Sequence, residues 1–405
     1  MAWAYTLTFA LDAGSVALSD VAGFSCTYGK RAESASYAAG VGTLELFNND
    51  GKFTPGGGGT FSDEEWIGKA FRLFVSDSAK SYTYGPPTVF AGVVEDIDLK
   101  IIDTKQSRLT VKIIDRLGQL SQMMLGDPDD SGGIAFTGAN VSAQLDEIMD
   151  YQSVGQHGDE WVVVDLTNVG RTTQTGLKHE GSAGQLAQLL GQTDGGDVFC
   201  RQGRMLDANY QFNNLCFRPQ GTPSFKVAFG GFDDAGAGGT YLFRNLDVLV
   251  GGETVWTMAQ FERQGGDEQT VKAAASLISD YGLRGLRRTG LLNDTDADTA
   301  SMATAWVAQH QKPSVHVSQI TTQPLRPGDG NDPLFDLSIM DLATVKYTTP
   351  GAGSQQTYEG VIIGVKWAIT PDAAVGTFSL AKGDDLAAFI LNSALYGVLD
   401  TNRLN

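Results

Sequence analysis

An acidic run at residues 293–298, Asn-Asp-Thr-Asp-Ala-Asp, has the residue types and spacing best suited to metal chemistry in this sequence. Its carboxylates at alternate positions, Asp294, Asp296 and Asp298, could converge on Ca²⁺, a cation that prefers oxygen ligands. A calcium loop of the EF-hand kind that begins at Asp294 requires glycine at its sixth position and glutamate at its twelfth. The chain has Thr299 and Ala305 there, so the calcium-loop pattern fails.

The same acids fit the start of a helix. Met302, Trp306 and His310 follow at four-residue spacing, as on one face of a helix. Capping side chains and negative charge both stabilise a helix N-terminus. We therefore predict a helix from Thr295 to His310, and we interpret the acids as its beginning in preference to a metal site.

A search for catalytic groups gives negative results. The sequence has no G-x-S-x-G and no H-E-x-x-H, and the Gly-Lys pairs at 29–30, 51–52 and 68–69 lack the Ser or Thr of a P-loop. The histidines have no metal-ligand spacing and are interpreted as loop or surface residues: His157, His179, His310 and His316. The acids of one loop are interpreted as solvated: Asp127, Asp129 and Asp130. We predict no catalytic, cofactor-binding or metal-binding residue, and no enzymatic activity.

The charge of the chain argues against a nucleic-acid-binding protein. Lys and Arg number 29 and Asp and Glu number 47, so the net charge is −18. Arg284, Arg287 and Arg288 form one tight basic cluster. We expect these arginines to pair with nearby acids, such as Asp280, and not with phosphate.

The cysteines and the N-terminus indicate a chain without disulfides or membrane anchors. Cys26, Cys200 and Cys216 are odd in number and widely spaced, so we predict buried thiols, and neither a disulfide framework nor a zinc ribbon. The N-terminal MAWAYTLTFALDAG lacks a basic region before its apolar residues and is interpreted as a strand. No apolar run of about 18 residues occurs, so we predict no membrane-spanning segment. We expect a soluble chain that is made in the cytoplasm.

Hydrophobic periodicity predicts a β-rich α+β fold. Alternation with period two marks both ends of the chain, as at 43–47, 109–114 and 361–369. Helical spacing marks the middle, as at 117–124, 141–149 and 182–190. We predict two antiparallel β-barrel-like domains, at 1–118 and 316–382, that flank an inserted mixed α+β region at 119–315. Residues 383–405 are predicted to form a short helix, Asp384 to Leu391, and a C-terminal tail.

The stretch LELFNNDGKFTP at residues 44–55 predicts a sharp turn after a strand. Asn48, Asn49 and Asp50 tolerate the left-handed region of backbone conformation, and Gly51 adopts it without a steric penalty. The chain can therefore reverse direction directly after Phe47.

Several motifs of this sequence, in this order, resemble those of minor tail proteins of long-tailed bacteriophages. They are Cys26 to Arg31, Gly42 to Pro55, Phe71 to Val75, Val89 to Glu95, Ile114 to Leu117, Ala187 to Leu190, Gly195 to Phe199, Asn214 to Arg218, Ser279 to Arg284, and Leu395 to Leu404 around Tyr396-Gly397. The resemblance covers nearly the whole chain. The glycine-rich segments at 56–59 and 220–240 depart from it.

The resemblance implies a structural role at the tail tip. Such proteins form the baseplate hub, in which two barrel domains per chain let a homotrimeric ring join a sixfold tail tube to a threefold tip. The implied partners are further copies of this chain, the distal tail or tube protein, the tape measure protein, and tip or receptor-binding proteins. Genomic DNA would pass through the ring without specific binding, and the protein would be located in the virion after synthesis in the host cytoplasm.

Two other functions are weighed against the hub. Some tail-tip proteins carry a cell-wall hydrolase, but no catalytic motif occurs here. A receptor- or carbohydrate-binding tail protein would use aromatic side chains to stack on sugars, and the candidates are Trp66, Trp161, Trp256 and Tyr241. Aromatic residues at strand positions more often belong to the core.

Overall fold

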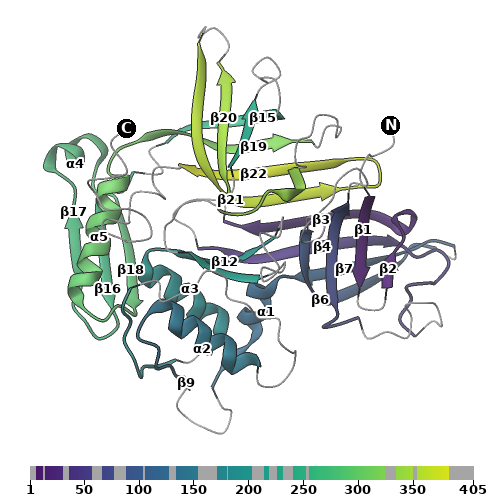
Figure 1. The fold of residues 1–405 in the computed structure, drawn as a ribbon, viewed down its shortest axis with the longest axis horizontal. Coiled ribbons are helices and arrows are strands. Elements are labelled where there is room, and N and C mark those ends of the chain that lie inside the picture. Colours follow the sequence, from purple (N-terminus) through teal and green to yellow (C-terminus); the bar gives the residue numbers. More distant parts are fainter. Residues whose placement is uncertain are drawn as a thin grey trace.

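The structure is organised around one long β-sheet (Figure 1). The computed structural model describes residues 6–11, 14–30, 36–56, 66–76, 88–103, 105–126, 134–153, 171–179, 181–202, 214–218, 226–230, 240–251, 255–323, 334–349 and 354–382. The sheet has 13 strands in the order β2-β1-β5-β6-β7-β4-β3-β21-β20-β14-β15-β19-β22. Both ends of the chain therefore contribute to a single hydrogen-bonded sheet.

The N-terminal half of this sheet is antiparallel throughout. Its strands are β1 (Thr6–Leu11), β2 (Gly14–Val16), β3 (Val21–Gly29), β4 (Ala38–Phe47), β5 (Ala70–Ser76), β6 (Thr88–Ile101) and β7 (Ser107–Ile114). Among the described residues no pairing joins β2 back to β3, so this set is open and the predicted N-terminal barrel is not closed. The edge of β3 that could close it pairs with β21 instead.

The C-terminal half has a different connectivity. Its strands are β14 (Lys226–Gly230), β15 (Thr240–Gly251), β19 (Ser314–Thr322), β20 (Leu342–Thr348), β21 (Gln355–Ile369) and β22 (Ala374–Lys382). These six strands are hydrogen-bonded in the order β21-β20-β14-β15-β19-β22. The last strand, β22, also pairs with the first, β21, so the series of pairings ends on the strand where it began. The strands β14 and β15, from the middle of the chain, take part in this ring of pairings.

The two halves meet where β3 lies antiparallel to β21, from the pair Gly29↔Gly364 to the pair Phe24↔Ile369. Gly29 has a φ of 96°, and a Cβ atom added there would lie 2.6 Å from the Cα of Gly364. Only glycine permits this close approach of the two backbones, because it has no side chain and adopts positive φ freely.

One hydrophobic core runs beneath both halves of the sheet. On the C-terminal side the Trp367 ring stacks on Phe335 at a centroid distance of 4.6 Å and meets the edge of Phe378 at 5.7 Å. On the N-terminal side Phe24 stacks on Phe71 at 5.8 Å. Phe335 lies in a short 3₁₀ helix, η3 (Leu334–Asp336); a second one, η1 (Leu18–Asp20), precedes β3.

Three central helices share this core: α1 (Arg116–Gln122), α2 (Val141–Ser153) and α3 (Ala183–Asp194). Helix α3 packs against both others, and a capping box begins it, in which Ser182 Oγ accepts from Gln185 N and Gln185 Oε1 accepts from Ser182 N. Gly195, in the left-handed conformation, ends it. Short strands surround the helices: β8 (Met124–Leu125), β9 (Ile134–Ala135), β10 (Lys178–His179), β11 (Gly181–Ser182), β12 (Asp197–Arg201) and β13 (Asn214–Arg218).

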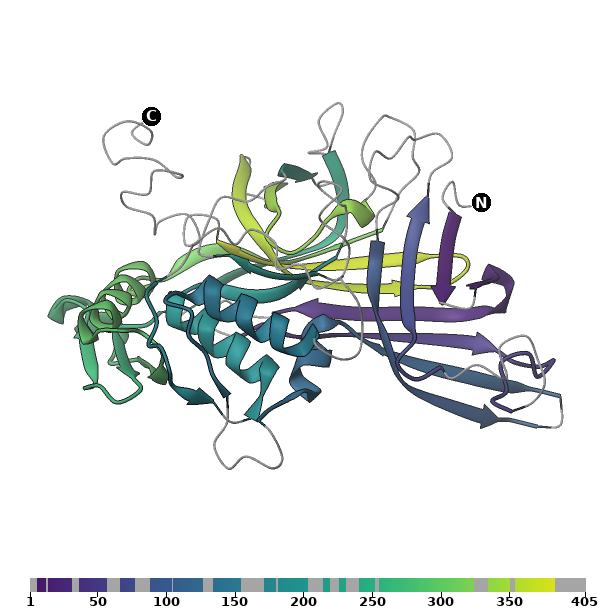
Figure 2. The same cartoon turned by 60° about the horizontal axis from the view of Figure 1, so that its bottom comes forward.

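Residues 258–310 form a separate lobe, here called the lateral module. It contains β16 (Met258–Arg263), β17 (Gln269–Lys272), α4 (Ala275–Tyr281), β18 (Gly285–Leu291) and α5 (Asp296–His310). Its own small core holds Ala259, Phe261, Leu291, Met302, Ala303 and Val307. The module lies at one end of the long axis of the molecule (Figures 1 and 2).

The β-rich α+β fold predicted from periodicity is confirmed, as are the helices predicted near 117–124, 141–149, 182–190 and 295–310. The helix predicted at Asp384 to Leu391 lies outside the described residues. In the described part of the chain no helix is long and apolar enough to cross a membrane.

Candidate assembly surfaces

The hairpin β6–β7 carries the most exposed large apolar side chain in the described residues, Ile101 at 72% exposure. Its turn is fixed by backbone N–H groups of Ile102 and Asp103, which both donate to the carbonyl of Gln106. The N–H of Lys105 donates to Asp103 Oδ1 at 2.7 Å. Ile102, next to Ile101 in the chain, is 51% exposed.

The turn after β4 holds the base of this tip. Asn48 is buried, and its Oδ1 accepts from Phe53 N at 2.7 Å while its Nδ2 donates to Thr54 Oγ1 at 2.8 Å. Ser107 Oγ donates to the carbonyl of Asn48 at 2.6 Å. Since Ser107 pairs with Ile101 across the hairpin, the Asn-Asn-Asp-Gly turn positions the apolar tip.

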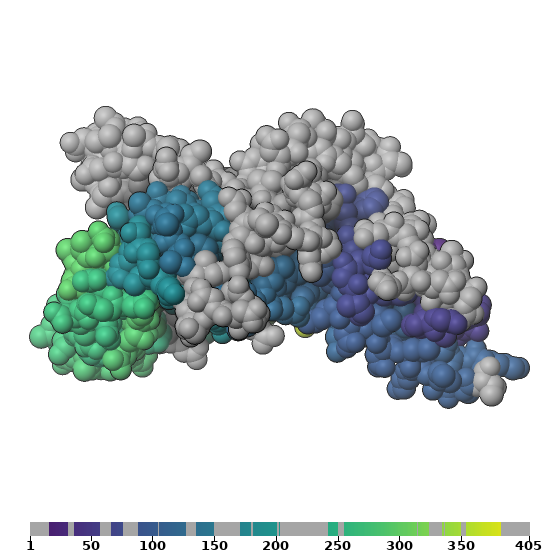
Figure 3. Space-filling model, turned by 90° about the horizontal axis from the view of Figure 1, so that it is seen from below, coloured from purple at the N-terminus to yellow at the C-terminus, as the bar shows by residue number. Residues whose placement is uncertain are grey.

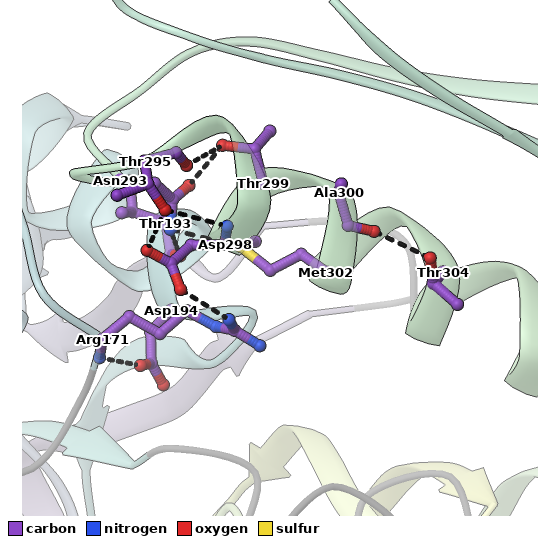
Figure 4. Close-up of polar contacts among 10 residues, drawn as sticks. All are labelled: Arg171, Thr193, Asp194, Asn293, Thr295, Asp298, Thr299, Ala300, Met302 and Thr304. Atoms are coloured by element: carbon purple, nitrogen blue, oxygen red, sulfur yellow. Dashed lines mark hydrogen bonds and ion pairs between the residues drawn. The ribbon is translucent and has the colours of Figure 1, made fainter.

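A buried polar joint connects the lateral module to α3 (Figure 4). Thr193 Oγ1 accepts from Leu292 N at 3.0 Å, and Asn293 Nδ2 donates to the carbonyl of Thr193 at 3.0 Å. Thr299, from α5, donates through Oγ1 to Asn293 Oδ1 at 3.5 Å. Thr193, Asn293 and Thr299 are fully buried, so these hydrogen bonds hold the module without access to water.

The acids of the run at 293–298 lie at the start of α5, as the sequence predicts. The N-cap is Thr295, whose Oγ1 accepts from Asp298 N. Asp296 and Asp298 lie in the first turn and pair with arginines: Asp296 Oδ1 lies 2.6 Å from Arg263 Nε, and Asp298 Oδ1 lies 4.0 Å from Arg171 Nη1. The described residues contain no group of three or more His, Cys, Asp or Glu side chains that could hold a metal ion.

The predicted pairing of the arginine cluster with acids is confirmed for Arg287, but its partners are Glu262 and Glu268, at 3.9 and 3.6 Å, instead of Asp280. Glu262 comes near Arg287 because β16, which carries Glu262, pairs with β18, which carries Arg287. Arg288 is half-buried, and its guanidinium lies over the rings of Phe261 and Trp306, at 5.4 and 4.9 Å from their centroids. Burial lowers the pKa of Arg288.

The interpretation of the histidines as loop or surface residues is wrong for those the structure describes. His179 lies buried in β10, and burial lowers its pKa. His310 ends α5, where its ring stacks on Trp306 at 4.0 Å and its Nδ1 lies 2.9 Å from the Trp306 carbonyl. His316 is half-buried in β19. His157 lies outside the described residues.

The cysteine prediction is confirmed for Cys26 and Cys200, which are buried free thiols. Burial raises the pKa of the Cys26 thiol, so it is protonated at neutral pH. Cys200 is also a hydrogen-bond acceptor, because its Sγ lies 3.1 Å from Leu117 N. Of Cys216 the structure describes only the backbone, which pairs with Phe199.

Of the four aromatic candidates for sugar stacking, the structure describes the side chains of Trp66 and Trp256. Trp66 is buried and meets Phe53 edge-on, so it belongs to the core. Trp256 is half-buried at the entry to the lateral module. Trp161 and the acidic loop Asp127, Asp129 and Asp130 lie outside the described residues, as does the side chain of Tyr241.

Two carboxyl groups, those of the buried Asp115 and the half-buried Asp194, have raised pKa values. Asp115 caps α1, accepting from Gly118 N at 2.9 Å and from Gly40 N at 2.7 Å. Burial raises its pKa from 3.8 to about 7, although these hydrogen bonds act in the opposite direction. Burial also raises the pKa of Asp194, which accepts from Arg171 N. Sequence inspection missed both groups, because nothing in the local sequence signals their burial.

Comparison with known proteins gives matches in structure alone. No family model matches the sequence, and no curated protein matches it. The 43 kDa tail protein of prophage MuSo2 from Shewanella oneidensis matches with a TM-score of 0.57 and 15% identity over 94% of this chain and 98% of that chain. A tail protein from Neisseria meningitidis MC58 matches with a TM-score of 0.58 and 10% identity over 95% and 98%. The chain has the fold of these tail proteins.

A component of a bacterial secretion system also matches this fold. The E. coli c3393 protein, a component of the type VI secretion system that is similar to the T4 tail proteins gp27 and gp5, matches with a TM-score of 0.52. Its identity is 10%, over 96% of this chain and 78% of that chain. At these identities the likeness establishes the fold, and it transfers no individual residue.

Proposed function

We propose that this chain is a structural subunit of a bacteriophage tail tip, the baseplate hub. Three copies form a ring below the tail tube, join the tube to the tip proteins, and line the conduit for DNA. The observation that carries this proposal is the shared fold, which spans 94% and 95% of this chain and 98% of each of the two tail proteins.

The arrangement of strands supports two hub domains per chain. Residues 1–118 and 316–382 each contain a long bulged hairpin, β6–β7 and β21–β22, with register shifts at Val94/Asp96 and Ile362/Gly364. The strands β14 and β15, from the inserted region 119–315, complete the C-terminal domain. Residues 383–405, for which the sequence predicts a short helix and a tail, lie outside the described residues. In the proposed ring, two β-rich domains in each of three copies present six units to a sixfold tube.

The chemistry of the described surfaces suits a structural role. Among the described candidate residues, Asp296 and Asp298 lie in the first turn of α5, and Trp66 and Cys26 are buried in the core. Cell-wall hydrolysis and sugar binding receive no support from them, and the burial of Trp66 removes one sugar-stacking candidate. The partners proposed for the hub are other copies of this chain, the distal tail or tube protein, the tape measure protein, and tip or receptor-binding proteins.

The charge of the chain suits passage of DNA without binding. With a net charge of −18, copies arranged around a lumen repel a polyanion electrostatically. We expect a net negative channel wall. A basic lumen in an experimental structure of the assembled ring would contradict this part of the proposal.

The deciding experiment measures mass and symmetry of the purified protein, together with its position on virions. Mass photometry and averaged images of negatively stained particles should show rings of three copies of the 43.1 kDa chain. Antibody against the chain should label intact virions at the tail end distal to the capsid. A monomer together with unlabelled virions would overturn the proposal.

A further inference from the structure

A buried ion pair between Lys30 and Asp197 brings an amine and a carboxyl group together where little water has access. Lys30 directly follows β3, and Asp197 begins β12, 167 positions later in the chain. Lys30 Nζ donates to Asp197 Oδ2 at 2.7 Å, and the two side chains are only 4% and 19% exposed. The pair joins the N-terminal strands to the central region, which Figure 3 shows in teal beside the green lateral module.

We propose that the side chains of Lys30 and Asp197 condense into an isopeptide bond, an amide that forms within the folded chain. One proton passes along the existing hydrogen bond from the ammonium group of Lys30 to the carboxylate of Asp197. The neutral amine attacks Asp197 Cγ, a second proton passes from the nitrogen to the departing hydroxyl group, and one water molecule leaves. The reaction needs no oxidant and no further reagent, and it does not depend on the proposed hub function.

The geometry holds the reacting atoms close together before the reaction. Lys30 Nζ is at hydrogen-bond distance from Asp197 Oδ2, and the carbon that it would attack is one bond further away. Both backbones are fixed, because Lys30 N donates to the carbonyl of Ile363 at 2.8 Å and Asp197 pairs with Arg218 in the β12–β13 hairpin. Well-oriented groups of one molecule react as if the partner were present at roughly 10⁵–10⁸ M. Amide formation can therefore compete with hydrolysis at this site.

The surroundings of the pair favour its neutral form. Lys30 Nζ lies 4.8 Å from the centroid of the Tyr37 ring, and Tyr37 packs on Phe199 with 5.3 Å between ring centroids. Both aromatic residues are buried. Removing two charges from water costs free energy, so burial brings the neutral amine and acid closer in free energy to the ion pair.

Tyr37 also supplies a proton donor near the pair. Burial, and to a smaller extent the Asp197 carboxylate, raises the pKa of Tyr37. Its hydroxyl group therefore stays protonated at neutral pH, and it is buried without a hydrogen-bond partner among the described residues. A donor of this kind stabilises the negative charge that develops on the carboxyl oxygen when the amine attacks.

A second ion pair of the same length provides a contrast within the chain. Lys52 Nζ lies 2.7 Å from Asp20 Oδ2, but these two side chains are 28% and 26% exposed. Water solvates both charges there and is available for hydrolysis. We therefore expect an amide at Lys30 and none at Lys52.

Mass spectrometry of the purified full chain tests the proposal directly. The intact mass under denaturing conditions should be lower than the sequence mass by one water molecule. Digestion with trypsin should give a branched peptide that joins Lys30 to Asp197, because trypsin does not cleave after an amidated lysine. The full sequence mass, with no branched peptide after prolonged incubation of the folded protein, overturns the proposal. Loss of water without a branched peptide also overturns it, because a cyclic imide at an aspartate gives the same mass.

Two matched variants test the assignment to this lysine. Lys30→Arg keeps the positive charge but removes the amine, so this variant should have its full sequence mass. Lys52→Arg is the control, and it should still lose one water molecule. Loss of water in the Lys30 variant, or its absence in the Lys52 variant alone, would contradict the assignment. If Lys30→Arg fails to fold, the branched peptide of the parent protein still decides the question.

Discussion

Lys30, at the end of β3, forms an ion pair with Asp197, at the start of β12, with 2.7 Å between Lys30 Nζ and Asp197 Oδ2. The two residues are 167 positions apart, and the lysine side chain is only 4% exposed. The backbone N–H of Lys30 donates to the carbonyl of Ile363 on β21, and its ammonium lies 4.8 Å from the centroid of the Tyr37 ring. One lysine thus connects the N-terminal, central and C-terminal parts of the fold.

Removing one partner of this pair should destabilise the protein. We expect Lys30→Met to lower the free energy of unfolding by about 3 kcal/mol, because it leaves the Asp197 carboxylate largely buried without its cation. Urea unfolding measures the change. The control is Lys112→Met, which breaks a solvent-exposed pair with Asp96 and should have a much smaller effect. Equal losses for the two variants would contradict the expectation.

Asp115 should make stability depend on pH. Its pKa is about 7 in the folded protein and near 3.8 when unfolded, so the folded state binds more protons between these values. The contribution of Asp115 to the free energy of unfolding is therefore fully present below about pH 4, and it is lost as the pH rises through 7. Asp115→Asn should remove this dependence, so between pH 4 and 8 the parent should lose up to about 4 kcal/mol more of its unfolding free energy than the variant does. Parallel stability curves from urea titrations across this range would rule out the raised pKa.

The joint between α3 and the lateral module should be sensitive to one hydroxyl group. Thr193→Val removes the acceptor for Leu292 N in a buried site, and should cost about 1–3 kcal/mol and accelerate hydrogen exchange at Leu292. Thr304→Val is the matched control. Both threonines donate to a carbonyl four residues earlier at 2.8 Å, but Thr304 is exposed. Unchanged exchange at Leu292 in the Thr193 variant would show that this hydrogen bond does not hold the module.

The β3–β21 junction should tolerate no side chain at residue 29. Gly29→Ala should cost several kcal/mol or prevent folding, since its methyl group would collide with the β21 backbone. Gly56→Ala is the control, because Gly56 also has positive φ but no heavy atom within 4 Å of an added Cβ. It should lose only about 1 kcal/mol from the unfavourable φ. Expression yield and the thermal unfolding temperature of the two variants measure the difference. Similar values for both variants would contradict close packing at Gly29.

Local signals in the sequence determined the individual elements. Apolar spacing at residues 182–190 was sufficient to predict α3, and acids ahead of residues at helical spacing were sufficient to predict the start of α5. The Asn-Asn-Asp-Gly turn was also predictable, because residues that favour left-handed backbone act within a few positions. Ordered motifs along the chain indicated a tail protein before any fold was known.

Tertiary structure alone decided how distant segments meet. The pairing of β3 with β21, the recruitment of β14 and β15 into the C-terminal strands, and the Lys30–Asp197 pair all join residues far apart in the chain. Period-two alternation shows that a strand has a buried face, but it does not identify the strand's neighbour. Burial likewise set the protonation of Asp115, and the folded hairpin left Ile101 and Ile102 exposed. A strand's neighbour and a side chain's exposure depend on the packing of the whole chain, which no short stretch of sequence contains.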